Sequence, residues 1–135
     1  MGTIYVARSK ALQNWGGDVG LGKNLYKLGY VEDGTAEELL AGGLAGEKDW
    51  VVVKTQTADG MDEASLLERL ARKEKLVDPT YYPRIRGALG IVKVNLIQVE
   101  NSMRIRIALE TNQEPKDLKV KPADVAQYLI NNALG

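Results

Sequence analysis

The stretches TIYVAR at residues 3–8 and NLYKLGYV at residues 24–31 decide the fold of this 135-residue chain. Both are rich in the β-branched and aromatic side chains that strands favour, so each predicts a β-strand. The segment between them contains four glycines between residues 16 and 22. Because glycine accepts backbone angles that other residues avoid, we expect a flexible loop there.

Part of this segment, GDVGLGKN at residues 17–24, has the spacing of a phosphate-binding P-loop from Gly17 through Gly22 to Lys23. A P-loop joins a buried strand to a helix, and its Ser or Thr hydroxyl holds magnesium. Here Asn24 takes the place of that hydroxyl, and the residues that follow are typical of a strand. The sequence therefore favours a simple glycine loop over a nucleotide-binding loop.

Three further elements follow in the first half of the chain. GTAEELLAGG at residues 34–43 predicts a short helix, because Thr35 and Glu38 have the spacing of a capping box. WVVVKTQT at residues 50–57 is a continuous apolar run, which is typical of a strand covered on both faces. DEASLLERLARKEKL at residues 62–76 predicts an amphipathic helix that starts acidic and ends basic, as the helix dipole favours.

The C-terminal part predicts a β-hairpin and a last helix. IVKVNLIQV at residues 91–99 and MRIRIAL at residues 103–109 flank a turn, and apolar and polar residues largely alternate along both runs. PADVAQYLINNAL at residues 122–134 predicts a helix, because Pro122 suits the first helical position.

The predicted order is β-β-α-β-α, then the hairpin, then α. This order gives an α/β (α+β) fold class, with a small mixed sheet and helices packed on it. The length suggests one domain over residues 1–135, with a core at residues 3–76 and an extension at residues 90–135.

Composition limits the chemistry that the chain can perform. There is no cysteine and no histidine, so any metal site must use oxygen ligands, which suit magnesium, manganese or calcium. The sequence has neither a membrane-spanning apolar run nor a secretory pattern, so we expect a cytoplasmic protein without a membrane partner. The net charge is zero, but residues 31–68 are mainly acidic and residues 69–106 mainly basic, which favours separate acidic and basic faces.

TIYVARS and LYKLGYVED lie about twenty residues apart across the glycine-rich segment, and the short helix, apolar strand and amphipathic helix follow. Together they resemble the GIY-YIG nuclease superfamily, especially its divergent branch with YKIG in the second strand. The resemblance covers residues 3–76. It implies that Tyr5 and Tyr26 orient or deprotonate a water, that Gly29 matches the motif glycine, and that Lys27 stands where other branches place tyrosine.

The resemblance also implies a magnesium or manganese ion held by a glutamate, for which Glu68 is the first candidate and Glu63 the second. The arginine that steadies the phosphate in this family is missing, since no arginine occurs between Val31 and Glu68. Arg8, just past the first strand, is the candidate to replace it. Because loss of preorganised positive charge weakens phosphoryl transfer strongly, the resemblance implies weak or lost phosphodiester hydrolysis.

DNA or RNA is the partner that the resemblance implies. The basic side chains that would contact it are Lys23, Lys27, Arg84, Arg86, Lys93, Arg104 and Arg106. Three of them, Lys93, Arg104 and Arg106, alternate outward on the predicted hairpin, where a basic sheet face can follow a phosphate backbone.

A second hypothesis belongs to another class of protein. In it the chain is a non-enzymatic interaction domain, and residues 90–135 form a homo-oligomer or bind a partner protein, as edge strands and apolar hairpins commonly do.

Overall fold

A computed structural model describes residues 2–22, 24–32, 34–44, 47–77, 81–82, 85, 90–112 and 119–134. In this part of the chain one sheet has the strand order β3-β1-β2-β5-β4, and every ladder in it is antiparallel. The strands are β1 (Thr3–Ser9), β2 (Leu25–Val31), β3 (Trp50–Thr57), β4 (Lys75–Leu76) and β5 (Ile91–Lys93). The helices are α1 (Lys10–Asp18), α2 (Ala36–Ala41), α3 (Glu63–Ala71), α4 (Leu96–Thr111) and α5 (Pro122–Leu134).

The predicted α+β class is confirmed, and so is the presence of the three strands and three helices expected outside the hairpin. The sheet was expected to be mixed, but all its described ladders are antiparallel. The strand at residues 50–57 was expected to be covered on both faces, but β3 is an edge strand with half-buried and exposed residues. The helix expected at residues 62–76 ends at Ala71, and Lys75–Leu76 form β4.

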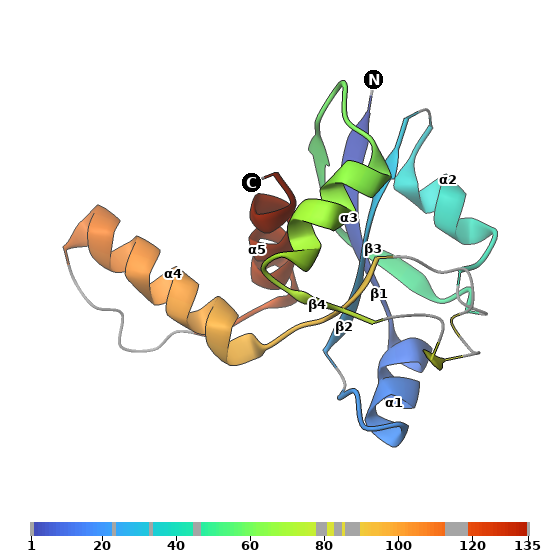
Figure 1. The fold of residues 1–135 in the computed structure, drawn as a ribbon, viewed down its shortest axis with the longest axis horizontal. Helices are drawn as coiled ribbons and strands as arrows, with labels where there is room; N and C mark the ends of the chain where they lie inside the picture. Colours follow the sequence, from blue (N-terminus) through green and yellow to red (C-terminus); the bar gives the residue numbers. More distant parts are fainter. Residues whose placement is uncertain are drawn as a thin grey trace.

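Side chains on neighbouring positions of β1 enter different cores, because successive strand residues point to opposite faces of the sheet. Ile4 and Val6 pack with residues of α3 and α5, whereas Tyr5 and Ala7 pack with residues of α2. Figure 1 shows α3 and α5 on one side of the sheet and α2 on the other.

Helix α1 occupies much of the segment that was predicted to be a flexible loop, so that prediction is wrong there. Ser9 caps the helix, and its side-chain oxygen accepts a hydrogen bond from the Leu12 N–H at 3.1 Å. Gly16 lies inside the helix. Only glycine fits at this position, because a Cβ atom would come within 2.5 Å of both the Gly22 carbonyl oxygen and the Leu25 side chain. The glycine thus serves close packing of α1 against the start of β2.

The same helix rules out the P-loop arrangement. A P-loop needs the order strand, loop, helix, so that backbone N–H groups at a helix N-terminus face the phosphate. Here Gly17 lies in the last turn of α1, and the chain then enters β2. The carbonyl end of a helix, which carries partial negative charge, faces this turn.

The predicted hairpin is also wrong, apart from the short strand β5. Asn95 begins α4, since its side-chain oxygen accepts a hydrogen bond from the Ile97 N–H at 3.0 Å. Asn112 ends the helix in the left-handed conformation, with φ 57°. Within the helix, Glu100 and Arg104 form an ion pair four residues apart at 2.8 Å. Capping and this pair favour a helix over the strand that the alternating residues predicted.

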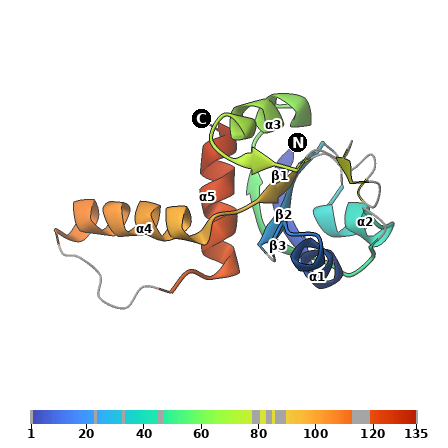
Figure 2. The same ribbon diagram turned by 60° about the horizontal axis from the view of Figure 1, so that its bottom comes forward.

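Helix α4 differs from the others in its surroundings. Figures 1 and 2 show it extending away from the rest of the molecule, whereas α5 lies against the sheet and α3. Among the described residues, no helix combines the length and the apolar character that a membrane crossing requires.

Candidate functional site

Tyr5 and Tyr26, the two tyrosines predicted to act together, lie on opposite faces of the sheet. Tyr5 is in the core on the α2 side, and Tyr26 is in the core on the α3 and α5 side. The β1–β2 register pairs Tyr5 with Gly29 and Ala7 with Lys27. Directly paired residues share a face, so the structure brings Tyr5 near Lys27 and keeps it apart from Tyr26.

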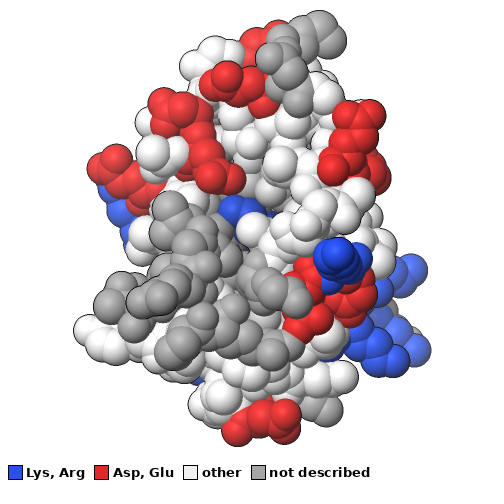
Figure 3. All heavy atoms as spheres, turned by 90° about the vertical axis from the view of Figure 1, so that its right-hand side faces the viewer, with Lys and Arg blue, Asp and Glu red and all other residues white. Residues whose placement is uncertain are grey.

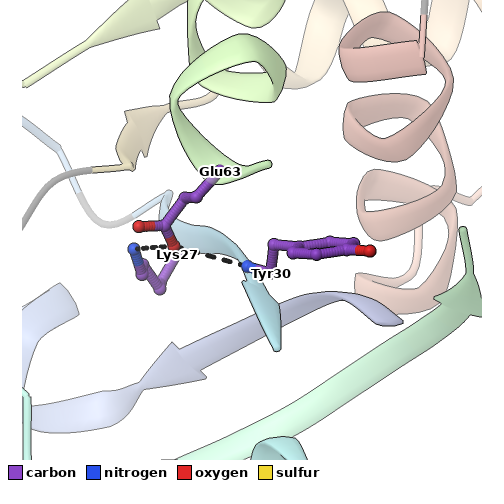
Figure 4. Close-up of polar contacts among 3 residues, drawn as sticks. All are labelled: Lys27, Tyr30 and Glu63. Carbon is purple, nitrogen blue, oxygen red and sulfur yellow. Dashed lines mark hydrogen bonds and ion pairs between the residues drawn. The ribbon is translucent and has the colours of Figure 1, made fainter. Parts of the chain in front are cut away.

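Lys27 lies at the centre of a buried polar arrangement (Figure 4). Its side chain is only 5% exposed, and its Nζ lies 3.4 Å from Glu63 Oε1. The same oxygen accepts a hydrogen bond from the Tyr30 backbone N–H at 3.3 Å. Strand β5 pairs with β2 only as far as Lys27. Beyond it the Leu28 N–H donates to the Gly90 carbonyl at 3.0 Å, and Glu63, the first residue of α3, accepts from the next outward N–H of β2, that of Tyr30.

Tyr5 belongs to the same arrangement, which we call the polar centre (Tyr5, Lys27 and Glu63). Burial, and then the charge of Glu63, raises the pKa of the Tyr5 phenol to about 12. Burial lowers the pKa of Lys27, and the charge and hydrogen bond of Glu63 oppose that change. The carboxylate of Glu63 therefore acts electrostatically on both side chains.

Gly29 is required by the position of Tyr5. A Cβ atom on Gly29 would overlap the Tyr5 ring, whose Cζ would be 2.5 Å away. Tyr5 of β1 and Gly29 of β2 therefore form one packing unit across the ladder. Both residues stand in the stretches that predicted β1 and β2, but the sequence gave no sign that they touch.

Tyr26 contacts Arg8 on the other face. Burial raises the pKa of the Tyr26 phenol, and the charge and hydrogen bond of Arg8 oppose that increase. Arg8 is exposed to solvent. The arginine predicted to replace the missing phosphate-binding residue thus accompanies Tyr26 and lies away from the polar centre.

The two glutamates predicted to bind a metal have different surroundings. Glu68 is exposed on α3 and forms an ion pair with Arg72 at 3.2 Å. Glu63 faces the Lys27 ammonium, and a divalent cation on the same carboxylate would be repelled by it. Among the described residues, no group of three or more Asp or Glu side chains is placed to hold a metal ion.

An open basic surface lies where β4 forms the edge of the sheet. Lys75 on β4 pairs directly with Lys93 on β5, and like charges opposite each other destabilise a sheet. Both lysines, together with Lys73, line a hollow of about 600 Å³. The acidic residue Glu74 also lines the hollow, as do the uncharged polar residues Asn24, Asn95 and Gln98 and the apolar start of α4, including Ile97. We call these three basic residues and their surroundings the lysine hollow.

The sequence predicted only Lys93 of this hollow. Lys73 and Lys75 lie in the run RLARKEK, which reads equally well as the solvated end of a helix. The turn after α3 and the short strand β4 bring them beside Lys93, a partner eighteen or more residues away in the sequence.

The other predicted nucleic-acid contacts do not form one surface. Arg104 is in an ion pair with Glu100, and Arg106 lines a different hollow of about 490 Å³ together with Lys54. Lys27 is buried in the polar centre.

Three further predicted contacts, Lys23, Arg84 and Arg86, lie outside the described residues. On the face drawn in Figure 3, which is the α2 side, acidic side chains of the described residues form several small patches, and basic side chains lie beside some of them. A single basic face is therefore not seen on that side.

Comparison with known proteins adds no family. No family model, no curated protein and no solved structure matches this chain. The geometry thus offers two sites of different character, a polar centre in which only Glu63 is partly exposed and an open lysine hollow.

Proposed function

We propose that this chain is a GIY-YIG-like, nucleic-acid-associated domain that binds the phosphate backbone of DNA or RNA, with weak or lost hydrolysis. The observation that carries the proposal is the like-charged pair Lys75 and Lys93 with Lys73 beside it. Phosphate contacts with lysine supply most of the affinity of non-specific nucleic-acid binding.

The lysine hollow has the chemistry that a phosphate backbone needs. Strand β4 is at the edge of the sheet, and Lys73, Lys75 and Lys93 are all exposed. A bound phosphate relieves the repulsion between the two facing ammonium groups. The side chains of Asn24 and Asn95 add hydrogen-bonding groups for sugars and phosphates at the same hollow.

The polar centre supports binding without efficient cleavage. A general base needs a pKa near the working pH, and the Tyr5 phenol, with a pKa raised to about 12, stays protonated at neutral pH. Tyr5 and Lys27 are also nearly inaccessible to solvent, at 2% and 4% exposure. Neither side chain can reach a phosphate without movement of the surrounding chain.

Fluorescence anisotropy of labelled single- and double-stranded DNA and RNA at several salt concentrations tests the proposal. We expect salt-sensitive binding, and we expect the slope of log affinity against log salt to fall by about 0.7 to 0.9 for each lysine removed. Lys75→Ala and Lys93→Ala are the test variants. Lys48→Ala, an exposed lysine outside the hollow, is the control.

Equal losses in the Lys48→Ala control would mean that only overall charge matters, and no binding at low salt would refute the proposal. Lysines on an edge strand also discourage aggregation. If this is their only role, Lys75→Ala and Lys93→Ala proteins would precipitate without losing affinity for DNA or RNA, which would also refute the proposal.

The same probes, incubated with magnesium or manganese and separated on a gel, test hydrolysis. We expect no cleavage, or slow cleavage. Efficient cleavage that is lost in Tyr5→Phe and Glu63→Gln, but kept in Glu68→Gln, would show that the polar centre opens and works as a catalytic site.

A further inference from the structure

Helix α4 is packed on one side only. Val99 is fully buried and Met103 packs against the main core. On the opposite side Ile97, Ile105 and Leu109 are 67%, 62% and 83% exposed. A single exposed apolar residue is normal, but three on one side of a projecting helix suggest a contact surface.

The exposed residues form a continuous stripe. Positions 97, 101, 105 and 109 are each four residues apart, so each contacts the next in a row that turns by about 40° around the helix axis at every step. We call Ile97, Asn101, Ile105 and Leu109 the α4 stripe. Figures 1 and 2 show that no other described element covers α4 along its outer length.

We propose that the α4 stripe binds the α4 stripe of a second copy of this chain, with the two helices antiparallel. A two-fold axis near residue 103 brings Ile97 opposite the partner's Leu109 and Asn101 opposite the partner's Ile105. The stripe is therefore complementary to itself, as an isologous two-fold interface requires. The sixteen-residue helix provides about 24 Å of contact length.

Charges beside the stripe agree with the antiparallel direction. Glu100 and Arg104 lie on one flank of α4 and form an ion pair in the single chain. In an antiparallel pair each flank meets the same flank of the other helix, so Glu100 comes within reach of the partner's Arg104 and the reverse. In a parallel two-fold pair the same flanks would lie on opposite sides of the interface, so Glu100 would be out of reach of the partner's Arg104.

The surface beside the stripe is hollowed. A shallow hollow of about 560 Å³ is lined by Gln98, Asn101, Ser102 and Ile105 of α4, by Tyr128 and Asn132 of α5, and by Lys73, which also lines the lysine hollow. The partner helix, lying along the stripe, would place its side chains against this hollow. The lining residues from α5 would then become part of the interface.

Sedimentation velocity or light scattering over a wide concentration range tests the proposal. We expect wild-type protein to reach twice the chain mass of 14.8 kDa, and Ile105→Asp with Leu109→Asp to stay at the chain mass. Leu39→Asp is the matched control, because Leu39 is an apolar residue 54% exposed on α2. Circular dichroism must show that each variant keeps its helices.

A wild-type chain that stays monomeric at high concentration would overturn the proposal. So would a dimer that survives Ile105→Asp with Leu109→Asp, or one that Leu39→Asp disrupts equally.

Disulfide trapping tests the direction of the pair, because the chain has no cysteine of its own. We expect Asn101→Cys protein mixed with Ile105→Cys protein to form a covalent dimer quickly under mild oxidation. Each variant alone should cross-link much more slowly, since its cysteines would lie about four helical residues, or 6 Å, out of register. Cross-linking that is fastest in the single-variant samples would refute the antiparallel arrangement.

Discussion

Replacing Glu63 by Gln tests the electrostatic account of the polar centre. The change keeps the size of the side chain and removes the negative charge that faces the Lys27 ammonium at 3.4 Å. Removal of one partner from a fully buried ion pair costs about 3–5 kcal/mol of the free energy of unfolding. Glu63 itself is 40% exposed, so water already weakens the pair. We therefore expect a loss of about 2 kcal/mol at neutral pH.

The assay is urea unfolding followed by circular dichroism at several pH values. The pKa of Lys27 is lowered by burial, so the folded protein favours the neutral amine once Glu63 no longer opposes that effect. Loss of the carboxylate should then matter most where Lys27 is charged, and the destabilisation should shrink as the pH rises. Glu68→Gln is the control on the same helix, and its exposed ion pair predicts a change below about 1 kcal/mol.

Lys27→Met gives the complementary measurement. Glu63 can be hydrated when the ammonium is gone, so this variant should lose less stability than Glu63→Gln. If Glu63→Gln costs no more than Glu68→Gln, or if its cost does not fall with rising pH, Glu63 does not hold Lys27 in its charged form and the account of the polar centre is wrong.

Two further predictions concern Tyr5. Gly29→Ala should cost about 1–3 kcal/mol, because the new methyl group overlaps the Tyr5 ring, and a double-mutant cycle with Tyr5→Leu in urea unfolding should recover much of that cost; additive costs would contradict the contact. The free energy of unfolding should also fall as the pH rises from 10 to about 12, because the unfolded phenol ionises at pKa 10.0 while the folded one is raised to about 12. Alkaline unfolding of Tyr5→Phe should show a weaker fall, and an unchanged profile would count against that pKa.

The main elements of the fold could be predicted from short-range patterns. β1, β2 and β3 follow runs of β-branched and aromatic residues, and α3 follows the leucine stripe with an acidic start and a basic end. Helix α1 was missed because glycine is a poor helix former, and only its contact with Leu25 explains Gly16.

The segment that became α4 shows the limit of periodicity. Ile97, Ile105 and Leu109 fit the alternation typical of a strand and also the four-residue spacing typical of a helix. Alternation alone could therefore not separate a strand from a helix. The cap at Asn95 was the local signal that could have decided it, because its side chain satisfies an N–H at the start of the helix.

The candidate site depended on register, which the sequence by itself did not determine. The amino acids alone established that β1 and β2 are strands and that they carry Tyr5, Arg8, Tyr26 and Lys27. The tertiary structure decided their faces, because pairing Tyr5 with Gly29 joins odd-numbered residues of both strands. Tyr5 therefore meets Lys27, and Tyr26 meets Arg8. A shift of one residue would turn every side chain of β2 to the other face, and only packing against α2, α3 and α5 selects between the two registers.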